Sequence, residues 1–195
     1  MIAPDPLQYG WWLAGRASGV VALALVTLSV AAGLAMAGRV SRRPGVARRL
    51  RGAHEHLALV GLAMIGVHGL TLLGDHWLHP GLRGIAIPLW MNYRPAATGA
   101  GILAGYVAAA LGLSFYARRR LGARRWRRAH RLTIAVYALA VVHALGAGTD
   151  AAALRAPILA TTVPIGVLLA RRLTRGRRRT PVASRPAVPV GEGAR

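Results

Sequence analysis

The chain has 195 residues, of which 54% are hydrophobic, and a chain of this length is expected to form one domain. It carries 26 basic residues, all of them arginine, against five acidic ones, so that the formal net charge is +21. Cysteine is absent, which excludes disulfides, thiolate metal sites, iron–sulfur clusters and thiol nucleophiles. Arginine without lysine, together with abundant alanine and glycine, is typical of a GC-rich bacterial genome.

Apolar runs of about twenty residues, the length that crosses roughly 30 Å of hydrocarbon, recur along the chain. The sequence therefore predicts an all-α polytopic membrane bundle of five transmembrane helices, or six elements if a short interfacial segment is counted. The expected spans are 13–37, 54–74, 97–117, 131–149 and 156–172.

Three segments are expected outside these spans. Residues 1–12 form an outer segment that ends in Trp11 and Trp12, aromatic residues that suit the headgroup layer. The stretch 84–90 is too short to span, so it is expected at the interface or against the bundle. Residues 173–195 are rich in arginine, proline, serine and glycine, which predicts a disordered cytoplasmic tail. This tail is too short for a flavin- or nicotinamide-binding domain, and no GxGxxG or GxxxxGK[ST] motif occurs.

The arginines alternate between loops along the chain. Six lie in 39–51, seven in 118–128 and eight after residue 170. The opposite side carries only Arg16, Arg83, Arg94 and Arg155. This is the positive-inside pattern of a multi-pass cell-membrane protein, and it predicts an outer N-terminus and a cytoplasmic C-terminus. A basic inner face attracts anionic membrane lipid, so nucleic acid is not expected as a partner.

Four histidines form two pairs, His54 with His68 and His130 with His143, and each pair lies along one predicted helix. Ionisable residues inside membrane helices are costly and usually functional. His54 and His130 adjoin arginine-rich loops, which predicts a common inner level. His68 and His143 lie roughly 20 Å further along their helices, at an outer level. Two facing neutral imidazoles at each level would fill both axial positions of a haem iron, which suits electron transfer.

The helical angle between the histidines differs in the two pairs. A spacing of 14 returns His68 to within about 40° of the direction of His54. Gly61 lies between them on the same stripe and is expected to admit a flat porphyrin or a close helix. The spacing of 13 leaves His143 about 140° from His130 on an ideal helix. The second pair therefore requires an irregular first turn at His130, a local deviation of the helix, or offset haems.

Other interpretations of the histidines remain open. A histidine beside arginines at a helix end is often interfacial, and a deeper one can serve helix–helix hydrogen bonding. His56 lies about 120° from His68, so it is a poorer ligand, and His76 and His79 are expected to face solvent or to support the site. The alternative function is a non-redox helical membrane protein, such as a small transporter or assembly factor, that uses histidine for packing or proton handling. Only Glu55 lies near a span, which disfavours a proton relay.

Several short segments carry a family resemblance. They are Arg16–Gly19, His54–Leu57, Val67–Leu70, Tyr93–Pro95, Trp126–His130 and Val142–Asp150. These segments resemble the ferric reductase-like transmembrane domain family, which includes ferric reductases, NADPH oxidases and the haem-bearing membrane subunit of the bacterial periplasmic methionine-sulfoxide reductase. The resemblance covers roughly residues 11–172, and it makes 13–172 the expected haem domain. Larger members carry a cytoplasmic flavin and nicotinamide domain, and many have six spans, so this chain departs from the family in both respects.

The resemblance implies that the four histidines of the two pairs ligate b-type haem, with two haems expected. It implies an oxidoreductase component, a cytochrome b subunit that moves electrons from a cytoplasmic flavoprotein or quinol to an outer-face acceptor. Ferric iron, oxygen and a periplasmic reductase are the candidate acceptors. Arg16 and Arg94 are expected on the outer side, either paired with haem propionates or as interfacial anchors. Trp126 is expected to be an interfacial belt residue rather than an electron-transfer group.

Overall fold

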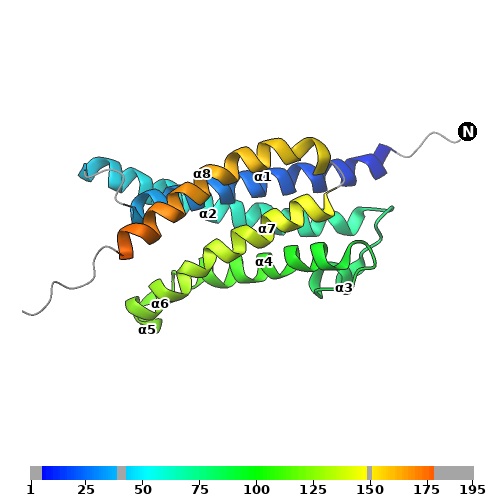
Figure 1. Ribbon diagram of the computed structural model, residues 1–195. Helices are drawn as coiled ribbons and strands as arrows, with labels where there is room; N and C mark the ends of the chain where they lie inside the picture. The colour runs from blue at the N-terminus through cyan, green and yellow to red at the C-terminus, as the bar shows by residue number, and fades with distance from the viewer. Residues whose placement is uncertain (1–5, 39–42, 149–150, 178–195) are drawn as a thin grey trace, which may run out of the picture.

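The computed structural model describes residues 6–38, 43–148 and 151–177, and the regular structure of this part of the chain is entirely helical. Its long helices lie side by side, and α1 begins at the opposite end of the bundle from the end of α8 (Figure 1). The elements are α1 Pro6–Ala37, α2 Pro44–Thr71, η1 Leu72–Gly74, α3 Gly81–Ala86, α4 Pro95–Leu113, α5 Arg118–Leu121, α6 Ala123–Ala129, η2 His130–Leu132, α7 Thr133–Ala147 and α8 Ala151–Arg177.

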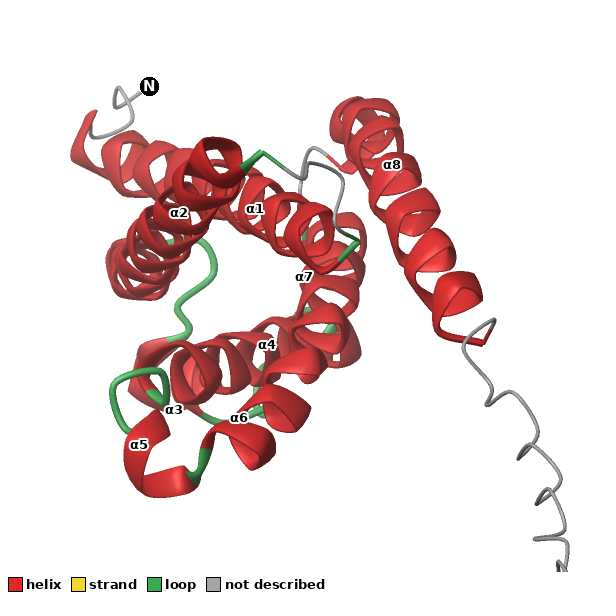
Figure 2. Cartoon of the chain, turned by 90° about the vertical axis from the view of Figure 1, so that its left-hand side faces the viewer, coloured by secondary structure: helices red, strands yellow, loops and turns green. Residues whose placement is uncertain are grey.

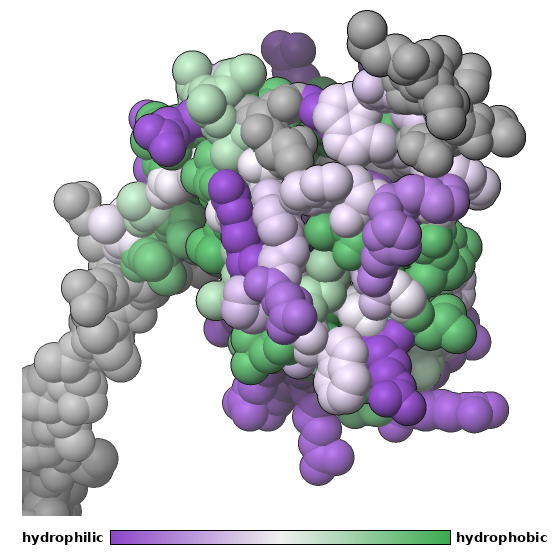
Figure 3. Space-filling model, turned by 90° about the vertical axis from the view of Figure 1, so that its right-hand side faces the viewer, coloured by the Kyte–Doolittle hydropathy of each residue, from purple (hydrophilic) through white to green (hydrophobic). Residues whose placement is uncertain are grey.

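Five helical segments in these ranges are long and apolar enough to cross a membrane. They are Tyr9–Ala37, Gly45–Gly74, Pro95–Leu113, Ala123–Ala147 and Ala151–Thr174. The predicted all-α, multi-pass membrane bundle is therefore confirmed. Figure 3 looks onto the end of the bundle where α1 begins and shows hydrophilic and weakly polar residues over that end, with hydrophobic residues along the sides. Large apolar side chains exposed along the helices, such as Leu28 and Val163, suit contact with lipid tails.

Several helix ends differ from the predicted boundaries. α1 begins at Pro6, so the last residues of the expected outer segment are helical. α2 begins at Pro44, well before residue 54, because proline fits the first helical turn and arginine favours helix. α8 continues through Arg177, past the expected end at 172. The hydrophobic pattern marks the part of a helix that lies in hydrocarbon, whereas backbone hydrogen bonding continues beyond it. The remainder of the predicted tail, 178–195, lies outside the described residues.

The spanning helices form two antiparallel pairs and a fifth helix. α1 packs along α2, and α4 packs along α7, whereas contacts between the two pairs, α1 with α7 and α2 with α4, are sparser. α8 lies against α1 and α7, on the side of the bundle away from α2 (Figure 2). A buried cluster joins α1, α7 and α8 through Val30, Leu34, Tyr137 and Ile165. This cluster fixes α7 relative to α1 and so sets the distance between the α1–α2 pair and the α4–α7 pair.

The connection between η1 and α4 folds onto the bundle. The hydroxyl of Tyr106, on α4, donates a hydrogen bond to the carbonyl of Ala86 at 2.6 Å. Leu89 packs so closely over Gly99 that a Cβ on this glycine would lie 3.1 Å from the Leu89 backbone nitrogen. The stretch 84–90 therefore packs against the bundle, which was one of its two predicted placements.

Candidate cofactor-binding site

The structure brings the four histidines together as the two predicted pairs. The ring centroids of His54 and His130 lie 6.0 Å apart, and those of His68 and His143 lie 6.1 Å apart. The planes of the two rings are inclined at 88° in the first pair and at 71° in the second. All four side chains are partly buried. The predicted facing of helices two and four of the membrane bundle, which are α2 and α7, is therefore confirmed.

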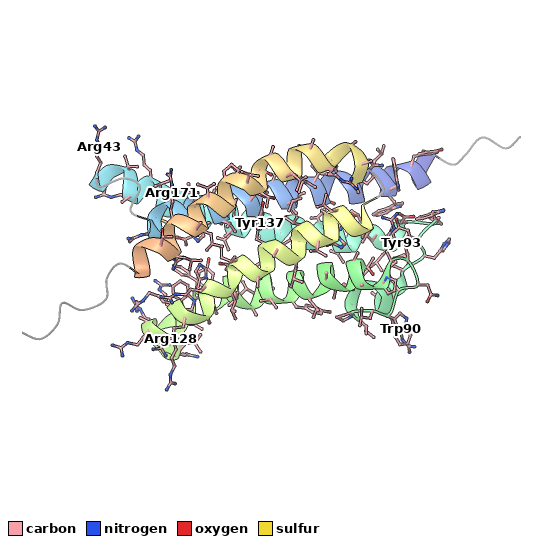
Figure 4. The ribbon with its side chains drawn as sticks, in the orientation of Figure 1. Arg43, Trp90, Tyr93, Arg128, Tyr137 and Arg171 are labelled. Atoms are coloured by element: carbon pink, nitrogen blue, oxygen red, sulfur yellow. The ribbon has the colours of Figure 1, made fainter. Side chains whose placement is uncertain are left out.

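The two pairs occupy different levels of the bundle. Figure 4 shows Arg43, Arg128 and Arg171 at one end of the molecule and Trp90 and Tyr93 at the other. The first pair lies toward the arginine-rich end, because His54 is in the first half of α2 and His130 directly follows α6. The second pair lies toward the opposite end, near the close of α2 and of α7. We term the level at the arginine-rich end the inner level and the other the outer level.

The separation of the rings fits two imidazoles bound to opposite sides of one metal ion. A metal–imidazole bond is about 2.0 Å long. The centroid of a five-membered ring with bonds of about 1.3 Å lies about 1.2 Å from each ring nitrogen. Two opposed imidazoles on one ion therefore have centroids roughly 6 Å apart, and both pairs show this separation.

A backbone carbonyl oxygen lies within hydrogen-bond distance of Nδ1 in three of the four imidazoles. These contacts are His54 Nδ1 to Ser29 O at 2.8 Å, His68 Nδ1 to Gly15 O at 2.7 Å and His143 Nδ1 to Ala97 O at 2.9 Å. A carbonyl oxygen only accepts, so Nδ1 must carry the proton and donate it. The neutral ring then has its lone pair on Nε2. Metal-bound histidines are usually oriented in this way, by a hydrogen bond from the nitrogen that does not bind the metal.

A glycine follows each of these carbonyls by one helical turn. Residues i and i+4 of a helix lie on the same side, so a glycine at i+4 leaves the carbonyl of residue i open to an approaching ring. An added Cβ would lie 3.0 Å from the His68 ring at Gly19, 3.3 Å from the His54 ring at Gly33, and 2.6 Å from Cγ of His143 at Gly101. We term each carbonyl with its glycine an imidazole cradle. The three cradles are Gly15/Gly19, Ser29/Gly33 and Ala97/Gly101.

The two cradles of α1 are a repeated unit. Gly15 and Ser29 are 14 residues apart, as are Gly19 and Gly33, and the same spacing separates the two histidines of α2. Because α1 and α2 are antiparallel, each cradle meets one imidazole. None of these residues was predicted to hold a histidine. The shared spacing of 14 was the signal that could have identified them.

A change of helix type reduces the angular mismatch of the second pair from about 140° to about 80°. α6 ends at Ala129, and the 3₁₀ segment η2 covers His130–Leu132 before α7 begins. A 3₁₀ helix advances about 120° per residue instead of about 100°, so three residues remove about 60° of the mismatch. The irregular first turn was one of the three conditions predicted for this pair, and it is confirmed.

Gly61 contacts a helix. A Cβ at this buried position would lie 3.4 Å from Cβ of Leu25 and 3.6 Å from Cγ2 of Val26, both on α1. Of the two predicted roles, close helix packing is therefore correct. Gly61 lets α1 approach α2 between the two cradles.

The other histidines described lie apart from the pairs. His56 is exposed, and its Nδ1 lies 2.8 Å from the carbonyl of Gly52 in its own helix, as its angular position predicts. His76 and His79 are exposed in the loop between η1 and α3, with ring centroids 6.0 Å apart. His79 adopts a left-handed backbone conformation, with φ of 42°. Of their two predicted placements, facing solvent or supporting the site, their exposure fits the first.

Arg16 and Arg94 lie close to the cradles of the outer level. The Arg16 guanidinium stacks over the ring of Trp12 at 4.2 Å. Arg94 has a left-handed φ of 44°, and its Nη1 donates a hydrogen bond to the carbonyl of Gly146 at 2.6 Å, near the end of α7. Each arginine is within three residues of a cradle carbonyl. This placement fits both predicted roles, contact with haem propionates and interfacial anchoring.

Comparisons with protein-family models, with curated proteins and with solved structures gave no match to this chain.

Proposed function

We propose that the chain is a membrane cytochrome b subunit that binds two b-type haems, one between His54 and His130 and one between His68 and His143. The observation that carries the proposal is the combination of ring separation and ring orientation. Both pairs have the spacing of two axial ligands on one ion. Three of the four rings donate Nδ1–H to a carbonyl, so that Nε2 is available to a metal.

The donor set fits haem better than a bare metal ion. A structural zinc site uses four protein ligands and a catalytic one uses three. In the described part of the chain, no group of three or more histidine, aspartate or glutamate side chains could hold an ion. A haem iron already has four porphyrin nitrogens and needs only axial ligands from the protein. The sparse contact between the α1–α2 and α4–α7 pairs also suits a flat ring between α2 and α7.

Haem, when bound, supplies reversible one-electron chemistry. The residues of this chain determine how that chemistry is used. The two imidazoles of each pair would hold the haem iron from both sides, which would leave no coordination site for a substrate and would favour electron transfer. The cradles hold the rings, and the apolar helices exclude water. Two levels on the same pair of helices, roughly 20 Å apart, provide a route between the two ends of the bundle.

The proposed direction of electron flow follows from charge. The arginine-rich end is assigned to the cytoplasm by the positive-inside rule, with the N-terminus outside and the protein in the cell membrane. In this orientation the inner pair of histidines would face a cytoplasmic flavoprotein or quinol as electron donor. The outer pair would face ferric iron, oxygen or a periplasmic reductase as acceptor. The resemblance to the ferric reductase-like family supports this assignment.

Proton handling, as in the alternative non-redox function, is disfavoured by the partners of the imidazoles. A relay needs groups that both donate and accept protons. The Nδ1 atoms of His54, His68 and His143 instead meet backbone carbonyls, which only accept.

Absorption spectroscopy of the purified protein, made with ample haem supply, tests the proposal. We expect a Soret band, a dithionite-reduced α-band and two haems per chain. His68→Ala and His143→Ala should each remove the outer haem, and His54→Ala the inner one. His56→Ala is the matched control, because His56 lies on the same helix but outside the pairs, and it should retain both haems. A colourless preparation, or full haem content in His68→Ala and His143→Ala, would contradict the proposal.

A further inference from the structure

His130 is the one imidazole of the four without a cradle. Its Nδ1 is buried and has no hydrogen-bond partner among the described residues. The ring is instead stacked on Trp126, with centroids 4.8 Å apart and planes inclined at only 21°. Trp126 precedes His130 by four residues, about one helical turn, so α6 and η2 bring the two rings together.

The sequence of α4 and the turn after it explains why this cradle is missing. α1 repeats its cradle after 14 residues. The same step from the single cradle of α4 leads to Leu111 and Phe115. A phenylalanine thus stands where the cradle has glycine, and its ring lies edge-on to Trp126 with centroids 5.9 Å apart. Aromatic contacts therefore replace the carbonyl and the glycine at this position.

Trp126 is itself held in place by the end of α4. Its Nε1 donates a hydrogen bond to Oγ of Ser114 at 3.1 Å, and this hydroxyl donates to the carbonyl of Leu111 at 2.7 Å. The helix that holds His143 directly through Ala97 therefore holds Trp126, and Trp126 orients His130.

We propose that Trp126 is the positioning residue of His130, and that the inner haem consequently has one axial ligand held by ring stacking. This inference rests on the proposed function. A hydrogen bond from Nδ1–H to a carbonyl increases the basicity of the imidazole and its donation to the metal. His130 lacks this bond, so it is the weakest donor of the four. The inner haem is therefore the more readily released of the two and the more sensitive to changes around its ligand.

Substitutions of Trp126 in the full-length, haem-loaded protein test this role. The measurements are haem per chain and the electron paramagnetic resonance signals of the ferric irons, assigned to inner and outer haem with His54→Ala and His68→Ala. Trp126→Ala should reduce haem content about two-fold, with loss of the inner signal and an unchanged outer signal. Trp126→Phe keeps an aromatic ring but loses the bond to Ser114, so it should retain both haems and alter the inner signal alone. Trp90→Ala, an exposed tryptophan of the outer loop, is the control and should change neither.

The possible results separate this inference from the proposed function. Unchanged inner and outer signals in Trp126→Ala would overturn it. If Trp126→Ala loses all haem through misfolding, Trp126→Phe decides, because a change in the inner signal alone supports the inference and a change in both or neither overturns it. A wild-type protein without haem would refute the proposed function itself, whereas two haems that are insensitive to Trp126 would refute only its positioning role.

Discussion

Replacement of Gly101 by alanine perturbs the cradle with the closest approach between helix and ring. The new Cβ would lie 2.6 Å from Cγ of His143, whereas carbon atoms in contact normally lie about 3.5–4.0 Å apart. Either the ring or α4 must therefore move by about 1 Å. The imidazole cannot turn away without cost, because its Nδ1 is hydrogen-bonded to Ala97 and its Nε2 is the proposed iron ligand.

The expected magnitude follows from the two interactions that such a shift disturbs. The Nδ1 to Ala97 O distance of 2.9 Å would exceed the usual hydrogen-bond limit of about 3.2 Å, at a cost of about 0.5–1.5 kcal/mol. Steric overlap in a packed interior costs about 1–3 kcal/mol. The total of about 1.5–4.5 kcal/mol corresponds to a fall of about 10- to 2,000-fold in affinity for the outer haem.

The assay is haem per chain together with a redox titration of the purified variant. Gly101→Ala should lose the outer redox step and keep the inner one. Gly105→Ala is the matched control, because it lies one turn further along α4, where a Cβ would meet only Cγ2 of Ile65 at 3.5 Å, an ordinary contact. Two full redox steps in Gly101→Ala, or equal losses in both variants, would refute the reasoning that the glycine makes room for the imidazole.

The cradles of α1 yield two further predictions. Gly19→Ala should weaken binding of the outer haem more than Gly33→Ala weakens binding of the inner one, because the added Cβ would lie 3.0 Å from the His68 ring but 3.3 Å from the His54 ring. The rate of haem transfer to an apoprotein acceptor measures both effects. The reverse order would contradict the steric argument. Ser29→Ala should keep the inner haem, with its affinity lowered by less than about 1 kcal/mol. The backbone carbonyl 2.8 Å from His54 Nδ1 remains, and only the hydroxyl 3.0 Å from Nδ1 is lost. Loss of the inner haem in this variant would show that the hydroxyl holds the ring.

The length of an apolar run and the rise of a helix per residue are properties of short stretches of chain, so they could be predicted without knowledge of the fold. The number of spanning helices, the alternation of arginine between loops and the matched depths of the histidines depend only on these quantities. The poor angular position of His56 was predictable for the same reason. The need for an irregular turn at His130 also followed from a spacing of 13, although the sequence left three ways to meet it.

The tertiary structure decided which groups hold the histidines. The acceptors at Gly15, Ser29 and Ala97 are backbone carbonyls, which every residue type possesses, so no side chain marks them. The structure also decided that Gly61 faces α1 and that Trp126 stacks on His130. Each of these contacts joins different helices or adjoining helical segments, and depends on their relative rotation and distance. That geometry arises only when the helices pack, which is why the sequence determined the presence of the histidine pairs and the fold determined how each ring is held.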